Sequence, residues 1–562
     1  MKKRLPYGLS DYERIKTEEY YYIDKTHHIP TLEEAPDFLF FLRPRRFGKS
    51  LLVNMLIAYY DVNYKEKFQR LFGDTYIYAH PTKRKHSYYI MKFDFSAVDI
   101  TRYNESFKHH LNLRVDDFVE RYDIDISFKT QEPIDRLETL FDYSSKHSLP
   151  IYIFIDEYDN FVNKLLVSDM SNYKDVVTTK EALYKQFFTM LKVGTSSNNS
   201  AIRKMFFTGV SPLALYDVTS GSNIGSNISI NRKFNDFTGV TKEELHQLIC
   251  HYNLEDKKEL IVTRCDAWYD SYRFHQDTPH TLYNSDMILY YIYHLISSQQ
   301  EPDQLIDVNV RTDYSKLKYL VYTNQKLNGN FELLSRLLRD EQVTISELKD
   351  NFSAFEMLQT TNFSSFLFAL GFVTIEKRFL SINLKIPNQT IKKIVADFIE
   401  NAYRDIDFNL QLQRFNEHLA HFALDGDLKL FEYLNEQVKA QSSIRDYIEG
   451  EAFMKGFLIA YLSLNPYYEV KSEAEVTKGY VDILLNPIRD EIVYGGVIEL
   501  KYISKSHFTQ ELLEQKIQEA KAQLARYDIT QIPNLKQKEF LKVVLIYRSW
   551  ELVHCEIFQG EE

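Results

Sequence analysis

The amino-acid sequence predicts an α/β protein in which two α/β domains are joined by a mostly helical middle region. Short apolar runs alternate with helical patterns in the first half, helical periodicity dominates residues 240–440, and strand-like runs return after about residue 445. Strands that alternate with helices are typical of an α/β sheet. A chain of 562 residues is too long for one ordinary domain, so we expect domains over residues 1–290, 291–440 and 441–562.

Composition and charge narrow the class of protein. Hydrophobic residues make up 44% of the chain and charged residues 26%, which is the balance of a soluble globular protein. The formal net charge of -11 means that contact with nucleic acid must come from local basic groups or bound metal ions. The three cysteines lie far apart, which excludes a zinc knuckle or disulfide framework and suits a reducing cytoplasm. The longest apolar stretches fall well short of the ~20 residues of a membrane helix, so we expect a cytoplasmic protein without a membrane partner.

The first half contains a strand, a loop and a helix in direct succession. The apolar run Phe38–Leu42 predicts a buried strand, and Leu51–Leu56 predicts an apolar helix. Further strands are expected at Tyr88–Phe95, Ile151–Ile155 and Met205–Phe207.

The loop between that strand and helix contains Gly48-Lys49-Ser50, which predicts a phosphate-binding loop. In such a loop backbone N–H groups at a helix N-terminus wrap the phosphates of a nucleotide. Lys49 would neutralise the β and γ phosphates, and the Ser50 hydroxyl would hold Mg²⁺. Arg43 stands where the general pattern has its first Gly.

A second element supports the loop. The strand Ile151–Ile155 ends in Asp156 and Glu157, and we expect Asp156 to bind Mg²⁺ through water and Glu157 to polarise the attacking water. Thr208 follows another strand and either senses the γ-phosphate or is structural. The Gly-rich segment Ser220–Asn227 is either a loop near the nucleotide or a disordered insertion.

Several blocks of the first half resemble the predicted AAA-ATPase-like family, in which they run in the same order: Tyr20–Thr26, Arg43–Ser50, Ile155–Asp159 and Phe207–Ser211. The stretch Trp268–Phe274 with Leu282–Asn284 also resembles this family, although a Gly is usual where Ser271 stands. An Arg at the first loop position is the family's own form. The resemblance covers about residues 1–290 and implies ATP binding by Arg43, Arg45, Arg46, Phe47, Gly48, Lys49 and Ser50.

The middle region contains one departure from helical periodicity. Residues 363–387 predict a helix followed by two short β-like runs, Phe372–Ile375 and Ser381–Leu384. A winged-helix element is one interpretation, and such elements bind DNA or serve as packing modules.

The last third predicts a second α/β domain. We expect helices at Glu449–Leu464 and Gln510–Tyr527, and strands at Tyr468–Ser472, Tyr480–Leu485, Val497–Leu500 and Lys542–Tyr547.

Two of these strands end in polar residues. Asp482 follows one apolar run and Glu499-Leu500-Lys501 ends the next, where alternation places Glu499 and Lys501 on one face. Two carboxylates can hold a divalent ion, and the lysine can orient or activate water beside a scissile phosphate. Glu451, on the preceding helix, is a further candidate ligand. The alternative is an acidic strand end with a surface lysine.

The same residues resemble the PD-(D/E)XK nuclease domain commonly fused to this ATPase-like family. The likeness covers about residues 440–550 and includes Glu473, Gly479–Asp482 and the pair Gln523 and Tyr527 on one helix face. Many relatives carry Arg where Tyr480 stands. The resemblance implies a restriction-endonuclease-like α/β fold and cleavage of DNA or RNA with Mg²⁺ or Mn²⁺.

Together these features predict a Mg²⁺-dependent P-loop ATPase linked to a nuclease-like domain, with nucleotide state gating cleavage. One alternative is a nucleotide-driven switch that recruits partners while the nuclease-like fold only binds. Another is an active nuclease whose nucleotide is a structural ligand. The sequence leaves oligomeric state open, and an arginine finger could be Arg45, Arg46, Arg232 or Arg273.

Overall fold

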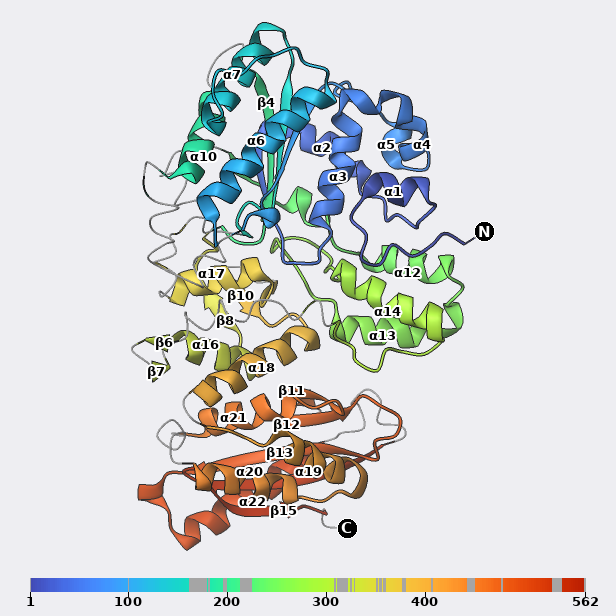
Figure 1. Ribbon diagram of the computed structural model, residues 1–562. Helices are drawn as coiled ribbons and strands as arrows, with labels where there is room; N and C mark the ends of the chain where they lie inside the picture. The colour runs from blue at the N-terminus through green and yellow to red at the C-terminus, as the bar shows by residue number, and fades with distance from the viewer. Residues whose placement is uncertain are drawn as a thin grey trace. The chain divides into compact units, whose positions relative to one another are not determined.

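Two compact units make up the computed structural model (Figure 1). Unit 1 comprises Met1–Leu320 and Thr344–Asn388, and unit 2 comprises Val321–Val343 and Gln389–Glu562. The three domains predicted from the sequence follow the positions of its motifs, and that division stays a prediction. The structure describes all residues except 1, 100, 161–178, 180–181, 196–199, 213–224, 308–309, 311–321, 324–325, 328, 350–351, 353–355, 357–359, 377–380, 406–407, 442–449, 477–478, 528–537 and 560–562.

Unit 1 is built on a five-stranded parallel sheet with the strand order β2-β3-β4-β1-β5. Its strands are β1 (Phe38–Leu42), β2 (Tyr89–Asp94), β3 (Ile151–Asp156), β4 (Ile202–Gly209) and β5 (Ser226–Asn227). The four strands predicted in this half are confirmed. The edge strand β5 lies in the Gly-rich segment expected to be a loop or an insertion, of which residues 220–224 lie outside the described residues.

Neighbouring side chains of the strands point to opposite faces of this sheet. Phe206 lies in the core cluster that includes α3 (Lys49–Tyr60), whereas Phe207 stacks on Phe188 of α10 (Leu183–Val193) with ring centroids 6.0 Å apart. A sheet buried on both faces explains why its strands are continuous apolar runs. The other helices beside it are α1 (Tyr12–Thr17), α2 (Ile29–Glu34), α4 (Phe68–Phe72), α5 (Tyr76–Ala79), α6 (Tyr103–Arg121) and α7 (Pro133–Lys146).

The parallel register brings three strand ends to one edge of the sheet. Leu42 pairs with Gly209, and Ile155 pairs with Phe207. The strand that leads into the predicted phosphate-binding loop is therefore separated from the strand that ends in Asp156 by β4 alone.

The rest of unit 1 contains further helices and a small sheet. Among the helices are α12 (Lys242–His251), α13 (Lys258–Trp268) and α14 (Ser285–Ser298). The expected helix followed by two strands is present as α17 (Thr360–Leu370), β9 (Thr374–Glu376) and β10 (Ile382–Lys385), with β8 (Val343–Ile345) beside β10. DNA binding by this element stays a prediction.

Unit 2 is built on a mixed sheet with the order β11-β12-β13-β14-β15. The strands are β11 (Tyr468–Val476), β12 (Gly479–Pro487), β13 (Tyr494–Ile503), β14 (Glu539–Arg548) and β15 (Glu551–Ile557). Only β13 and β14 run parallel to each other, and the other neighbours are antiparallel. The sequence did not predict β15, an antiparallel edge strand.

Helices cover this second sheet as well. One apolar cluster joins α22 (Gln510–Arg526) to β13 and β14. The other helices of the unit are α16 (Gly329–Leu338), α18 (Gln389–Asp405), α19 (Leu412–Asp425), α20 (Lys429–Ala440) and α21 (Glu451–Ser463), and two short strands, β6 (Tyr322–Thr323) and β7 (Lys326–Leu327), pair with each other.

Two helices expected in the middle region contact the sheet of unit 2. The N–H of Val493 donates to the carbonyl of Ala423 in α19 (3.0 Å), and the N–H of Leu552 donates to Asn435 in α20 (2.8 Å). Helical periodicity shows which face of a helix is apolar but does not show which sheet that face covers.

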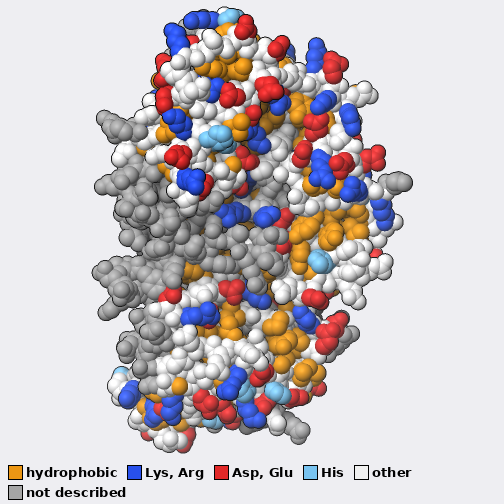
Figure 2. Space-filling view, viewed as in Figure 1, with side chains coloured by type: hydrophobic (Ala, Val, Ile, Leu, Met, Phe, Trp, Pro, Cys, Tyr) orange, Lys and Arg blue, Asp and Glu red, His pale blue; other side chains and the backbone are white. Residues whose placement is uncertain are grey.

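On the face shown in Figure 2, lysine and arginine side chains are interspersed with aspartate and glutamate. Among the described residues, no helix is both long enough and apolar enough to cross a membrane.

Ser271 provides a test of backbone strain in unit 1. Its φ is 75°, a left-handed conformation that costs a residue with a Cβ roughly 1–2 kcal/mol. Glycine avoids this cost but loses about 0.5–1 kcal/mol of backbone entropy. We therefore expect Ser271→Gly to stabilise the protein by about 0.5 kcal/mol, as measured by thermal or urea unfolding. Ser271→Ala keeps the Cβ and is expected to give no gain; equal effects of the two variants would contradict the assignment.

Candidate functional site

The loop between β1 and α3 has the conformation of an anion site. Arg46 and Gly48 have φ angles of 67° and 82°, and the N-terminus of α3 after Gly48 has no side-chain cap. The first N–H groups of that helix are therefore available to an anion. Lys49 lies across the loop, and its Nζ donates to the carbonyls of Arg43 and Pro44 (both 3.0 Å).

The Arg43 side chain is buried, at 1% exposure. Its guanidinium stacks over the rings of Phe41 and Phe274, with centroid distances of 4.4 and 3.9 Å. It donates at 2.6–3.3 Å to four backbone carbonyls, those of Leu42, Ser229, Phe234 and Asn235. The sequence placed this side chain among the nucleotide ligands, but the carbonyls already occupy both of its Nη atoms. The structure gives it the role of holding the strand end and the loop together.

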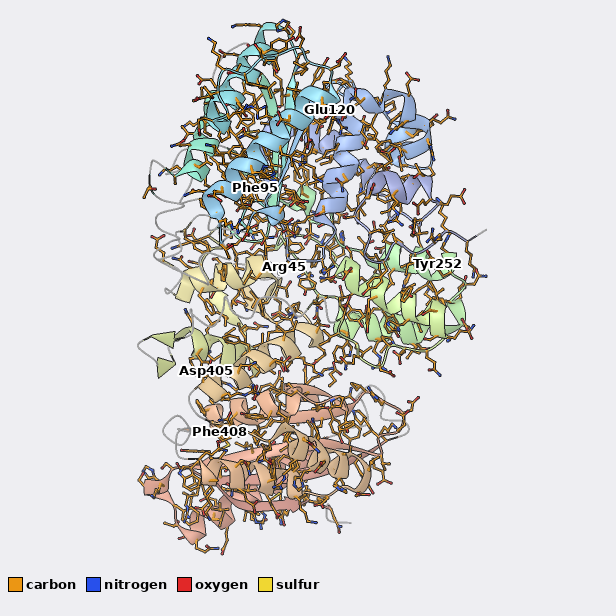
Figure 3. All side chains as sticks on the ribbon, viewed as in Figure 1. Arg45, Phe95, Glu120, Tyr252, Asp405 and Phe408 are labelled. Carbon is orange, nitrogen blue, oxygen red and sulfur yellow. The ribbon has the colours of Figure 1, made fainter. Side chains whose placement is uncertain are left out.

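The blocks around residues 268–284 hold the same loop. The Phe47 ring is fully buried and packs edge-on against Tyr272, with centroids 4.9 Å apart. The Asn284 side chain donates to the carbonyl of Arg45 (3.3 Å), a residue labelled in Figure 3. These contacts give a physical reason why the two blocks accompany the loop.

The carboxylates at the end of β3 lie beside Thr208 of β4. The Thr208 hydroxyl and the Glu157 N–H (3.1 Å) both donate to Oδ1 of Asp156, which is 2% exposed. Glu157 has a φ of 51°, and its carboxylate accepts from the Asn160 side chain. Backbone strain of this kind often occurs at functional sites.

Burial shifts two groups of this site toward their neutral forms. The pKa of Lys49 is lowered to about 8 by burial, against the attraction of nearby carboxylates, of which Asp156 is the strongest. The pKa of Glu157 is raised by burial and by the charge of Asp156, although Asn160 and Lys49 oppose the rise. A carboxylate with a raised pKa is a better proton acceptor at neutral pH.

A small cavity of about 80 Å³ lies beside Gly48. Tyr21, Tyr22 and Lys25 line it, as do Phe237 to Val240. The Lys25 ammonium is paired with Glu244 at 2.7 Å. The sequence did not predict this cavity. The Tyr20–Thr26 block, which forms part of its wall, was identified only as part of the resemblance to the ATPase-like family.

The four candidate arginine fingers differ in exposure. Arg46 and Arg232 are exposed, whereas Arg45 and Arg273 are partly buried. Arg46 lies 4.0 Å from Asp286. Their roles stay open.

The second candidate site lies in unit 2, where β12 and β13 are neighbours. The prediction that Asp482 and Glu499-Leu500-Lys501 end their strands is wrong, because β12 continues to Pro487 and β13 to Ile503. Oδ2 of Asp482 accepts from the N–H of Leu500 (2.9 Å), and Nζ of Lys501 lies 2.6 Å from Oε1 of Glu499. Glu451, at the start of α21, interacts electrostatically with Asp482 and Lys501. The structure therefore brings together all the residues that the sequence proposed for this site.

Like charges and burial characterise this site. Burial and the charge of Asp482 raise the pKa of Glu499 to about 7, and the same two causes raise the pKa of Glu451. Burial alone would lower the pKa of Lys501, but its contact with Glu499 outweighs burial and raises it. Crowded carboxylates of this kind are relieved by a divalent cation, so the donor set fits a hard metal ion.

Lys455 is a member of this site that the sequence analysis missed. Its ammonium pairs with Asp482 at 3.0 Å and with Glu473. Glu473 has a φ of 49° within β11. The signal was available: Lys455 stands four residues after Glu451, on the same face of a helix.

Tyr527 explains two other residues of the motif. Its hydroxyl donates to the carbonyl of Tyr480 (2.7 Å) and lies 3.1 Å from Oε2 of Glu499. A Cβ on Gly479 would lie 2.8 Å from the Tyr527 ring, so this glycine gives the ring room. The Tyr480 side chain, which replaces the arginine of many relatives, is 58% exposed. The buried Oε1 of Gln523 has no hydrogen-bond partner among the described residues.

Two sequence families match the chain. Residues 6–219 match the family described as Predicted AAA-ATPase, and residues 449–557 match the PD-(D/E)XK nuclease superfamily. The protein thus carries an AAA-ATPase-like domain followed by a PD-(D/E)XK nuclease-superfamily domain, and both resemblances are confirmed.

A curated relative is described as "Uncharacterized protein in vnfD 5'region" of Azotobacter chroococcum mcd 1. It is 22% identical over 292 residues, which are 51% of this chain and 52% of that protein. The chain therefore spans about half the length of the curated relative it matches.

Solved structures with a distant likeness to this chain include a Cdc6p and an ORC2 protein. Cdc6p from Pyrobaculum aerophilum has 9% identity and a TM-score of 0.28, with 69% of this chain and 98% of that chain covered. The ORC2 protein of Aeropyrum pernix has 12% identity in two forms. For the ADPNP-ADP complexes the TM-score is 0.33, with 70% of this chain and 98% of that chain covered. For the ADP form the TM-score is 0.32, with 69% of this chain and 98% of that chain covered.

The buried Arg43 leads to a stability prediction. Arg43→Ala leaves buried carbonyls without donors, and we expect it to destabilise unit 1 by about 3 kcal/mol. Arg43→Gly, which restores the general loop pattern, should destabilise as much, because the lost contacts are the same. Urea unfolding measures both. Arg46→Ala, an exposed change in the same loop, is the control and should stay within about 0.5 kcal/mol; equal losses in all three would contradict the role given to Arg43.

Proposed function

We propose that this protein binds and hydrolyses ATP with Mg²⁺, and that its C-terminal domain cleaves DNA or RNA with Mg²⁺ or Mn²⁺ in a manner gated by nucleotide state. The observation that supports the first activity most strongly is the uncapped N-terminus of α3 beside Lys49, at the sheet edge where Asp156 and Glu157 end β3.

The nucleotide reaction follows from the positions of these side chains. The first N–H groups of α3 bind the phosphates, and Lys49 exchanges two carbonyl contacts for the β and γ phosphate oxygens. Mg²⁺, held by Ser50 and through water by Asp156, would neutralise charge on those oxygens. Glu157 accepts a proton from the water that attacks the γ phosphorus, and ADP leaves. Thr208 keeps Asp156 in place through its hydroxyl.

The cavity beside Gly48 suits the base of the nucleotide. Tyr21 and Tyr22 offer aromatic surface there, and Phe237 adds apolar surface. Purine rings pack well on such side chains. The proposed phosphate site and this cavity adjoin at Gly48.

Substitutions at the loop and at β3 separate nucleotide binding from hydrolysis. Lys49→Ala should abolish nucleotide binding, whereas Glu157→Gln should still bind ATP and lower phosphate release by about 10²-fold or more, because the proton acceptor is lost. Nucleotide binding by fluorescence and phosphate release with Mg²⁺ are the measurements. Glu138→Gln, an exposed change in α7, is the control. Unchanged phosphate release by Glu157→Gln would contradict its role, and binding without release in the wild type would favour a structural nucleotide.

Nucleic-acid cleavage is supported by the network of Asp482, Glu499 and Lys501. Asp482 and Glu499, with Glu451, would hold a divalent ion, which would polarise the scissile phosphate and activate water. Lys501 orients that water or the phosphate oxygen. Tyr527 holds Glu499 through its hydroxyl. Water would attack the phosphorus, the bond from phosphorus to a sugar oxygen would break, and that oxygen would leave as a hydroxyl group.

A cleavage assay with one lysine removed tests this second activity. We expect wild-type protein to cleave plasmid, single-stranded DNA or RNA with Mg²⁺ or Mn²⁺, and Lys501→Ala to lower the rate by about 10²-fold or more. Since the pKa of Glu499 is about 7 and a metal ligand must be ionised, cleavage should rise with pH between about 6 and 8. Lys505→Ala, an exposed lysine in the same domain, should match the wild type.

Two outcomes of this assay decide between the alternatives. Absence of cleavage on every substrate would favour a nucleotide-driven switch whose nuclease-like fold only binds. Gating is tested by Lys49→Ala in the same assay, because a wild-type cleavage rate without nucleotide binding would contradict it.

A further inference from the structure

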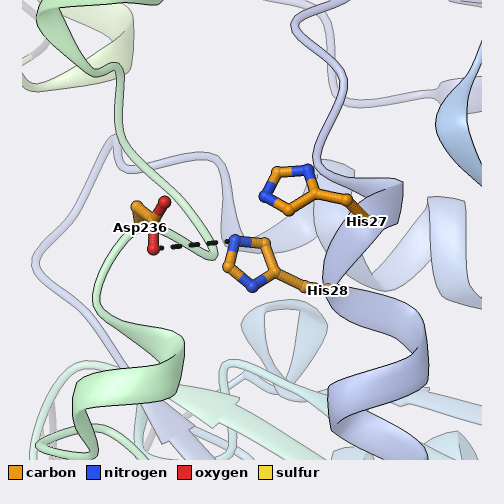
Figure 4. A group of neighbouring side chains, drawn as sticks. All are labelled: His27, His28 and Asp236. Atoms are coloured by element: carbon orange, nitrogen blue, oxygen red, sulfur yellow. Dashed lines mark ion pairs between the residues drawn. The ribbon is translucent and has the colours of Figure 1, made fainter.

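Two histidines and an aspartate meet at a point outside both sites (Figure 4). His27 and His28 end the 3-10 helix η1 (Thr26–His28), and Asp236 follows the 3-10 helix η4 (Arg232–Phe234). One ligand atom from each residue lies within 4.8 Å of the others. It is the one group of this kind found within the described part of the chain.

The environment of His28 is incomplete without a ligand. The side chain is buried, at 6% exposure. Its Nε2 makes no hydrogen bond with any described residue and lies 3.7 Å from Oδ1 of Asp236. A buried polar atom without a hydrogen-bond partner destabilises the folded protein. His27, by contrast, is exposed, so the cluster is accessible from solvent.

We propose that His27, His28 and Asp236 bind a Zn²⁺ ion, with water as a fourth ligand. Two imidazoles and one carboxylate are ligands typical of zinc, whereas Mg²⁺ prefers oxygen ligands alone. Zinc bonds of about 2.0–2.1 Å in a tetrahedron place ligand atoms roughly 3.4 Å apart. Rotation of the exposed His27 side chain can shorten the distances from its ring nitrogen to the ligand atoms of His28 and Asp236. The ion gives the buried Nε2 of His28 the partner that it lacks.

The position of this cluster suggests what the ion does. Lys25, two residues before His27, lines the cavity beside Gly48, and Phe237, next to Asp236, lines it as well. The rings of His28 and Phe237 are in contact, with centroids 5.2 Å apart. The ion would therefore fasten together two chain segments that both line the cavity. This consequence for nucleotide binding rests on the proposed function, whereas the zinc site does not.

Metal binding to the full-length, tag-free protein tests the site. Excess Mg²⁺ occupies sites made of oxygen ligands, and Zn²⁺ bound in equilibrium dialysis is then measured by atomic emission. Co²⁺ serves as a spectroscopic probe of tetrahedral nitrogen and oxygen ligation. We expect wild-type protein to bind one more equivalent of Zn²⁺ than His27→Ala, and Asp236→Asn to bind Zn²⁺ about tenfold or more weakly. Zn²⁺ should raise the unfolding temperature of the wild type and not of His27→Ala.

The chain offers a matched control in His109, an exposed histidine that also precedes a buried one, His110. His109→Ala should bind Zn²⁺ like the wild type. Equal Zn²⁺ binding by the wild type and His27→Ala would overturn the proposal, as would the absence of Zn²⁺ binding in excess Mg²⁺. If the wild type binds Zn²⁺ as expected but does not bind nucleotide, the result would instead count against the proposed function alone.

Discussion

The alignment of parallel strand ends is the constraint on which the candidate nucleotide site depends. Leu42, Gly209 and Ile155 stand at one edge because β1, β4 and β3 pair in a fixed register. A shift of one residue would turn Asp156 to the other face and separate it from Thr208. The apolar strands are buried on both faces, and this burial holds the register. The chemistry at the edge thus depends on packing within the sheet.

The buried arginine and lysine side chains have different partners in the two candidate sites. In unit 1 a buried cation, Arg43, is satisfied by backbone carbonyls, and Lys49 is held the same way. In unit 2 the lysines are held by carboxylates: Lys501 by Glu499, and Lys455 by Asp482. Carbonyl dipoles compete weakly with an incoming phosphate, whereas full negative charges compete strongly.

The sequence predicted those features that local patterns encode. Apolar runs identified β1 to β4 of the first sheet, and residue spacing identified Asp482, Glu499 and Lys501 as neighbours. What it could not predict are contacts between residues far apart in the chain. Arg43 reaches carbonyls more than 180 positions away, and no local pattern encodes this. The edge strand β15 and the packing of α19 and α20 likewise depend on which apolar surfaces are left to cover.

The lysines of the nuclease-like site pair with carboxylates, and this pairing implies an order in which metal and substrate bind there. As long as Asp482 and Glu499 hold the two lysines, neither ammonium can make a strong contact with a phosphate. A divalent ion that takes over these carboxylates would release Lys501 for an anionic substrate, whereas Lys455 would stay paired with Glu473. In the proposed function, metal binding therefore precedes productive substrate binding, and the site would be inactive toward nucleic acid without the ion. Lys49 needs no such release, because phosphate displaces only neutral carbonyls from it. In the proposed function, the nucleotide site can therefore bind phosphate before its own metal ion is in place.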